Sequence, residues 1–98
     1  MTMKTREEIL SVLAQQRPSL EHLFRVRRLA LFGSYARGDY QPNSDVDLLV
    51  EVDPSIGLDF VTLAETLEHA LGLPVDLVSR RALDAKHWEV IAPDLIDV

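Results

Sequence analysis

Two aspartates, Asp45 and Asp47, stand one residue apart at the start of an apolar run that ends at Val52. Side chains alternate between the two faces of a strand, so residues two positions apart project the same way. Two adjacent carboxylates repel each other unless a cation neutralises them, and carboxylates together with substrate phosphates are the usual ligands of Mg²⁺. The pair therefore predicts a Mg²⁺ site made by Asp45 and Asp47.

A third aspartate, Asp76, interrupts a second short apolar run, from Pro74 to Val78. We expect this run to be a strand beside the first, so that three carboxylates lie on adjacent strands. Such a set could hold one or two Mg²⁺ ions, and a pair of ions can clamp the attacking and leaving oxygens of a displacement at phosphorus. Asp76 is then a metal ligand and a candidate general base near an acceptor hydroxyl.

A glycine-serine pair, Gly33 and Ser34, follows an apolar segment and precedes Arg37 by one helical turn. Glycine allows the backbone to come close to a ligand, and the hydroxyl and amide groups at the start of a short helix can donate to phosphate oxygens. Arg37 can add a charge-assisted contact to the same phosphates. This turn is therefore a candidate site for a nucleoside triphosphate.

Each of these pieces also has an ordinary structural interpretation. Paired aspartates are more often solvated surface residues, a glycine-serine pair is more often a plain turn, and Asp76 can equally be a solvent-facing strand residue. The joint spacing is what favours the chemical interpretation: Gly33 and Ser34, ten residues, Asp45, one residue, Asp47, and then an aspartate inside a later strand.

This combined pattern resembles the signature of the DNA polymerase beta-like nucleotidyltransferase superfamily, and in particular its minimal nucleotidyltransferase branch. The residues that carry the resemblance are GSYARG at 33–38 and SDVDLLV at 44–50, with VDLV at 75–78 similar to the strand of the third carboxylate. The resemblance covers about residues 26–80. It implies the fold of that superfamily, an α/β (α+β) domain with helices packed on a small mixed sheet.

The resemblance also implies an activity and a set of roles. Gly33 and Ser34 would bind the triphosphate, Asp45 and Asp47 would ligate Mg²⁺, and Asp76 matches the third acidic position. Arg37 matches a family arginine that we assign to nucleotide binding.

Many minimal members are antitoxins encoded beside a HEPN-domain ribonuclease toxin, and they transfer AMP from ATP onto a toxin tyrosine. The resemblance therefore implies a HEPN partner from a neighbouring gene, a possible hetero-oligomer with it, and ATP as substrate. Two alternatives stay open: an inert antitoxin that neutralises its partner by covering it, and a transferase that modifies nucleic acid.

These residues must be positioned by a succession of helices and strands. Apolar periodicity, capping residues and turn residues predict that succession within one domain, residues 1–98. Strands 26–32 and 45–52 are joined by a short connection that favours antiparallel pairing, and helix 59–71 is typical of a crossover. The predicted elements are a helix at 6–16 broken at 17–19, a short turn to 24, a strand at 26–32, a helical turn at 35–37, a strand at 45–52, a helix at 59–71 capped by Gly72, a strand at 75–78, a helix at 82–91 and a strand at 95–98.

Charge and composition narrow the class of protein. Residues 1–38 carry a net charge of +4 and residues 39–98 a net charge of −10, within a total of −6. Because nucleic-acid binding depends on neutralising phosphates, the acidic half makes nucleic acid an unlikely direct ligand and disfavours the third alternative. The chain has no cysteine, no apolar segment long enough to span a membrane and no export signal at its start, so we expect a cytoplasmic protein with no membrane partner.

Two aromatic residues need an interpretation of their own. Tyr35 follows the glycine-serine pair, so it could stack on a nucleotide base, but packing in the core is at least as plausible. Trp88 lies in the last predicted helix, where we expect it to pack rather than to recognise a ligand. The scattered histidines have no ligand spacing, and we interpret them as surface residues.

Overall fold

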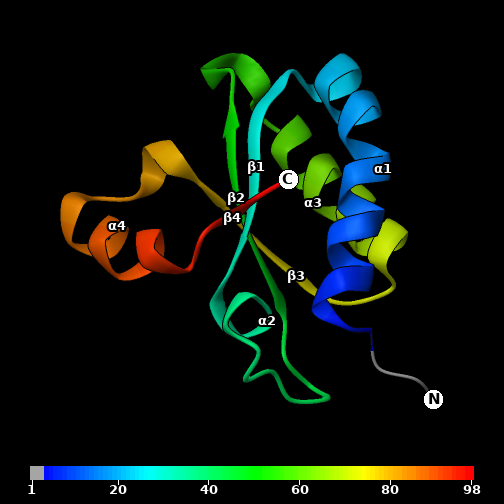
Figure 1. Ribbon diagram of the computed structural model, residues 1–98. Coiled ribbons are helices and arrows are strands. Elements are labelled where there is room, and N and C mark those ends of the chain that lie inside the picture. The colour runs from blue at the N-terminus through cyan, green and yellow to red at the C-terminus, as the bar shows by residue number, and fades with distance from the viewer. Residues whose placement is uncertain (1–3) are drawn as a thin grey trace.

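The computed structural model describes residues 4–98; the predicted absence of an export signal rests partly on residues 1–3, which lie outside the described part. Its centre is a four-stranded mixed sheet in the order β3-β2-β1-β4 (Figure 1). The elements in chain order are α1 (Arg6–Phe24), β1 (Val26–Phe32), α2 (Gly33–Arg37), β2 (Val46–Val52), η1 (Pro54–Ile56), α3 (Asp59–Leu71), β3 (Val75–Ser79), η2 (Arg80–Ala82), α4 (Ala85–Ile91), η3 (Ala92–Asp94) and β4 (Ile96–Asp97).

The strand pairing confirms the predicted fold class. β1 and β2 are antiparallel, as their short connection predicted, and β4 pairs antiparallel with the other edge of β1. β2 and β3 are parallel, and α3 crosses between them, as such a connection requires. β2 is therefore an inner strand, with a neighbour on each side.

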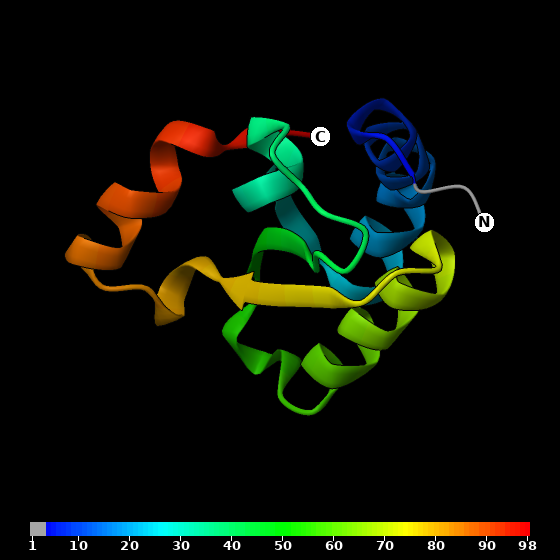
Figure 2. The same ribbon diagram turned by 90° about the horizontal axis from the view of Figure 1, so that it is seen from below.

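One face of the sheet forms the main core under α1 and α3. These two helices lie side by side against it, on the right of the sheet in Figures 1 and 2. Leucines at helical spacing on α3 meet alternate apolar residues of the strands, because both periodicities direct one row of side chains inward. The fully buried members include Leu13 and Leu20 of α1, Leu63, Leu67 and Leu71 of α3, and Leu29, Leu31, Leu48 and Val50 of the sheet.

The opposite face of the sheet is covered by the C-terminal segment. Ala30, Phe32 and Leu49 form a smaller apolar cluster there, with Trp88 and Leu95 packed against it. Both views place α4 on this side, away from α1 and α3 (Figure 2). Trp88 therefore packs, as the sequence predicted.

The predicted break in the first helix is wrong, because α1 runs from Arg6 to Phe24 with Pro18 inside it. Proline lacks the amide hydrogen that would bond to the carbonyl of Ala14, four residues earlier. Ala14 and Pro18 both lie on the exposed side of the helix, so water can satisfy that carbonyl. Continuing the helix buries Leu20 in the core, which offsets the cost.

The last helix begins at Ala85 rather than at residue 82. The Asp84 side chain accepts a hydrogen bond of 2.8 Å from the His87 backbone N–H, which makes Asp84 the N-cap. Residues 80–82 form a separate 3-10 turn, η2.

The other boundaries differ from the predictions by a residue or two. β2 begins at Val46 rather than 45, β3 extends to Ser79, β4 is limited to residues 96–97, and α2 begins at Gly33 rather than 35. The α3 and β1 predictions are confirmed residue for residue, and Gly72 caps α3 with a left-handed φ of 69°. Within residues 4–98, no helix is both long and apolar enough to cross a bilayer.

Replacing Pro18 tests whether α1 really continues through this position. Pro18→Ala restores the missing backbone donor on an exposed helix face, which stabilises the folded state. Loss of proline also makes the unfolded chain more flexible, which opposes part of this gain. The free energy of unfolding is therefore expected to rise by about 2 kcal/mol. Urea denaturation measures the change. Ser19→Ala is the matched control at the next exposed position. If the two substitutions change the free energy of unfolding equally, the helix is interrupted at Pro18.

Candidate functional site

Asp47 and Asp76 are direct neighbours across the parallel ladder between β2 and β3. Their Cα atoms are paired in the register, and the preceding pair along the two strands is Val46 with Val75. Val46 and Leu48, on either side of Asp47, are fully buried in the main core, so Asp47 projects from the other face of the sheet. The structure thus brings together two of the three predicted carboxylates on one face.

Asp45 lies one residue before β2 and is exposed, whereas Asp47 is half-buried. The prediction placed both in the strand, but the first of them is in the connection that enters it. Asp45 still lies close enough to Asp47 for its charge to act there, as does Asp76. The three carboxylates therefore make one acidic group at the amino end of β2.

The environment raises the pKa of Asp47 to about 6. Burial is the largest cause, the charges of Asp76 and Asp45 add to it, and the charge of Arg37 opposes it. The ionised form of Asp47 is thus costly at neutral pH in the absence of a cation, as expected for a group whose charge needs a ligand.

Gly33 lies directly against the Asp47 carboxylate. Its φ is 73°, and a Cβ atom added there would stand 2.0 Å from Oδ2 of Asp47. The register of β1 with β2 explains the contact, because Phe32 pairs with Asp47 and Gly33 is the next residue. Only glycine combines this backbone conformation with this close approach.

α2 carries the remaining predicted residues from Gly33 to Arg37. Ser34 is half-buried, and its carbonyl oxygen accepts bonds from the N–H groups of Gly38 and Asp39, at 2.8 and 3.1 Å. These bonds end the helix and hold the turn in shape. The first amides of α2 have no acceptor within the helix, as at any helix start.

Arg37 is engaged by two carboxylates. Its Nε donates to Oδ2 of Asp39 at 3.2 Å, and its Nη1 donates to Oδ2 of Asp94 at 2.9 Å. The bond to Asp94, followed by that to Asp39, raises the pKa of Arg37. The charge of Arg37 thus acts on Asp47 while its guanidinium is tied to η3, near the end of the described chain.

Tyr35 is fully buried, and its ring stacks on that of Tyr40 with centroids 4.3 Å apart. Of the two interpretations left open by the sequence, the structure supports packing, because a buried ring has no face for a base. The Tyr35 hydroxyl has no hydrogen-bond partner within residues 4–98.

Sequence reasoning missed two residues that support the site. Nη1 of Arg6 in α1 donates to the carbonyl oxygen of Ala36 at 2.9 Å and so fixes α2 to α1. Asp94 is the other, through its bond to Arg37. The only sequence signal for either residue is its charge, because the contacts span 30 and 57 positions of the chain.

No three or more acidic, histidine or cysteine side chains within residues 4–98 are arranged as a ready-made cation site. This arrangement is compatible with Mg²⁺, which is usually held by one or two carboxylates and completed by substrate phosphates and water. The Asp47 carboxylate occupies the space beside Gly33 that the side chain of any larger residue would need.

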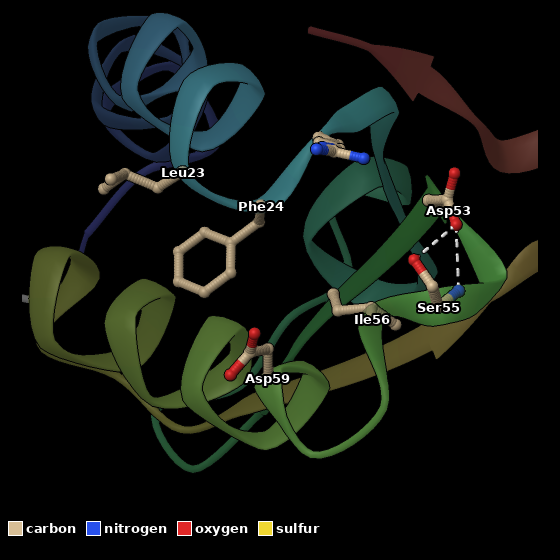
Figure 3. Close-up of a pocket in the computed structure, with 7 residues that line it drawn as sticks. Leu23, Phe24, Asp53, Ser55, Ile56 and Asp59 are labelled. Atoms are coloured by element: carbon tan, nitrogen blue, oxygen red, sulfur yellow. Dashed lines mark hydrogen bonds between the residues drawn. The ribbon is translucent and has the colours of Figure 1, made fainter.

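A separate hollow of about 290 Å³ lies at the other end of β2 (Figure 3). It is lined by Leu23, Phe24, Arg25, Asp53, Ser55, Ile56 and Asp59. Asp53 is engaged there by Ser55, whose N–H and hydroxyl bond to its Oδ1 at 2.9 and 2.7 Å. Because Asp53 follows the carboxyl end of β2 and Asp47 lies near its amino end, this hollow is not part of the acidic group.

Comparisons with known proteins agree on one family. The model of the Nucleotidyltransferase domain family matches residues 13–96. Protein adenylyltransferase MntA of Thermococcus cleftensis is 47% identical over 100 residues, covering 100% of both chains.

Two solved structures share the fold. A crystal structure of a toxin–antitoxin with AMP-PNP aligns with a TM-score of 0.69 at 25% identity, over 96% of this chain and 72% of that chain. A complex of a tri-AMPylated Shewanella oneidensis HEPN toxin with an MNT antitoxin aligns with a TM-score of 0.59 at 24% identity, over 94% and 66%.

The close approach at Gly33 can be tested against a glycine of similar conformation in open space. Gly72 has a φ of 69° and no atom within 4 Å of an added Cβ. Both alanine variants lose stability because of the left-handed backbone, but Gly33→Ala must also displace the Asp47 side chain. We expect Gly33→Ala to lower the free energy of unfolding by about 1 kcal/mol more than Gly72→Ala. Equal losses in thermal unfolding would contradict the contact.

The raised pKa of Asp47 predicts a pH-dependent stability in the metal-free protein. Because the folded-state pKa of about 6 exceeds the ordinary value of 3.8, the folded state binds more protons between these values. The contribution of Asp47 to stability is therefore favourable at low pH and is lost as pH rises through about 6.

Asp47→Asn removes this penalty and is expected to stabilise the metal-free protein at pH 7. A shift of two units corresponds to about 3 kcal/mol, and solvent screening of this half-exposed group reduces the expected gain to about 1 kcal/mol. Denaturation in EDTA at pH 7 and pH 5 measures it, and the gain should shrink at pH 5. Glu65→Gln, at an exposed position of α3, serves as the control. A loss of stability in Asp47→Asn at pH 7 would refute the prediction.

Proposed function

The chain belongs to the nucleotidyltransferase domain family, and we propose that it transfers AMP from ATP to a tyrosine hydroxyl of a HEPN ribonuclease toxin, with Mg²⁺. The observation that carries the proposal is the pairing of Asp47 with Asp76 beside Gly33, in a chain 47% identical to a protein adenylyltransferase over its full length. The chain is thus an enzyme of the transferase class, and the nucleotide, metal and acceptor are the parts that we propose.

Asp45 and Asp47 would hold Mg²⁺, with Asp76 as the third carboxylate. The raised pKa of Asp47 and the negative charges of Asp76 and Asp45 near it support a cation at this position. When bound, the ion supplies positive charge against the phosphate oxygens of the nucleotide. The chain's own part would be to hold these carboxylates near one another, through the register of β2 with β3.

The triphosphate would bind along α2, where Gly33 and Ser34 offer backbone and hydroxyl donors and Arg37 offers its guanidinium. In the reaction, the acceptor oxygen forms a bond to the α-phosphorus, and the bond from that phosphorus to the oxygen bridging to the β-phosphate breaks. Pyrophosphate leaves with that bonding pair. Asp76, exposed beside Asp47, takes the proton of the acceptor hydroxyl.

The proposed acceptor is a HEPN toxin encoded by a neighbouring gene. The motif resemblance is the first support, and a toxin–antitoxin with AMP-PNP that aligns over 96% of this chain is the second. An exposed Asp76 at the edge of the sheet also suits a large acceptor, because a protein hydroxyl can reach it from outside. The acidic character of residues 39–98 favours a basic protein surface over nucleic acid.

Label transfer tests the proposal directly. Wild-type protein, ATP, Mg²⁺ and the HEPN protein are incubated with label on the α-phosphate in one sample and on the γ-phosphate in another. Only the α-label should reach the partner, and Asp47→Asn should reduce transfer at least about a thousandfold because a charge at the reacting phosphate is lost. Glu65→Gln is the matched control and should transfer at the wild-type rate.

Each other outcome has a definite meaning. Transfer of the γ-label would identify a kinase. Undiminished transfer by Asp47→Asn would mean that the Asp47 carboxylate is not needed for the reaction. If the two proteins bind but no label is transferred, the chain neutralises its partner by covering it. In that case Asp47→Asn should still neutralise the toxin in cells.

A further inference from the structure

The guanidinium of Arg37 is fixed from two sides. Asp39, two residues along the chain, accepts a hydrogen bond from its Nε, and Asp94 of η3 accepts one from its Nη1. The Nη2 group is left without a hydrogen-bond partner within residues 4–98. The charge of Arg37 is felt at Asp47, so the guanidinium lies within electrostatic range of the acidic group. One donor group of Arg37 is thus free to bind a ligand.

Asp94 is itself held firmly, although η3 is short. The next residue, Leu95, packs against the cluster of Phe32 and Leu49 on the face opposite the main core. Two residues further, Asp97 accepts bonds from Nε and Nη2 of Arg28 at 2.7 and 3.2 Å. The side chain of Asp94 is only 23% exposed, compared with 63% for Asp39. Of the two carboxylates on Arg37, Asp94 is the fixed one.

The bond between Arg37 and Asp94 is not explained by stability alone. The Arg37 side chain is 48% exposed, and ion pairs at such positions contribute little to the free energy of unfolding. A guanidinium that meets phosphate, however, depends on the orientation of its planar fork. Fixing two of its three nitrogens before the ligand arrives reduces the ordering cost of binding.

We propose that Asp94 is a positioning residue, which holds Arg37 so that its free Nη2 edge meets the triphosphate of the nucleotide. The inference rests on the proposed function, in which Arg37 binds the triphosphate. It assigns a role in the site to the C-terminal segment, which otherwise packs on the sheet.

The test measures ATP binding apart from transfer. In Asp94→Ala, the dissociation constant of ATP with Mg²⁺, measured by calorimetry, is expected to rise about tenfold, the change for one charge-assisted hydrogen bond. KM for ATP should rise with it, while kcat changes less. Asp94→Glu should recover most of the affinity. Asp84→Ala is the control, because it removes the N-cap of α4 in the same segment without touching Arg37.

A double-mutant cycle separates positioning from general damage. Once Arg37→Ala is present, adding Asp94→Ala should weaken ATP binding no further, because nothing remains to be positioned. The ¹⁵Nε resonance of Arg37 should also shift in Asp94→Ala and not in Asp84→Ala. Additive losses in the two variants would overturn the inference.

The remaining outcomes distinguish the two proposals. Unchanged or tighter ATP binding by Asp94→Ala overturns the inference alone, and tighter binding would mean that Asp94 competes with the triphosphate for Arg37. A wild-type protein that binds ATP with Mg²⁺ but transfers no AMP to its partner overturns the proposed function. The ATP affinities of the wild-type protein and of Asp94→Ala still decide the role of Asp94 in that case.

Discussion

Two carboxylates on paired strands, Asp47 of β2 and Asp76 of β3, repel each other across a parallel ladder, and much of the fold serves to hold them there. Parallel pairing needs a crossover, which α3 supplies, and α3 stays in place because its three inward leucines are fully buried. The same strands turn apolar residues, such as Leu48 and Leu77, to that core. Repulsion on one face is therefore opposed by hydrophobic burial on the other.

The site is assembled from distant parts of the chain, and each part is secured differently. Gly33 is placed by the register of β1 with β2, and α2 is fixed by the bond from Arg6 to the carbonyl of Ala36. Arg37 is held by the C-terminal segment through Asp94. The rigid sheet thus positions the anions, whereas ionic and hydrogen-bonded contacts position the donors that face them. A nucleotide with its cation would bring the two sets of charge together.

The sequence predicted the sheet and α3 because apolar periodicity and the Gly72 cap are local signals that tertiary packing reinforces. It also predicted that Asp76 lies on a strand beside the strand of Asp47, and the pairing of β2 with β3 confirms this. It failed at Pro18, where burial of Leu20 outweighs a local preference, and at the start of α4, where the Asp84 cap was overlooked. No local pattern could reveal Asp94, because its bond to Arg37 joins residues 57 positions apart.

The position of β3 at the edge of the sheet has a further consequence. An edge strand offers unpaired backbone groups to any extended chain that meets it, and proteins block such joining with charge or proline. β3 has both, with the exposed Asp76 in the strand and Pro74 just before it. The carboxylate proposed for chemistry thus also stands where a charge disfavours pairing of this open edge with another chain, so one residue serves two physical purposes.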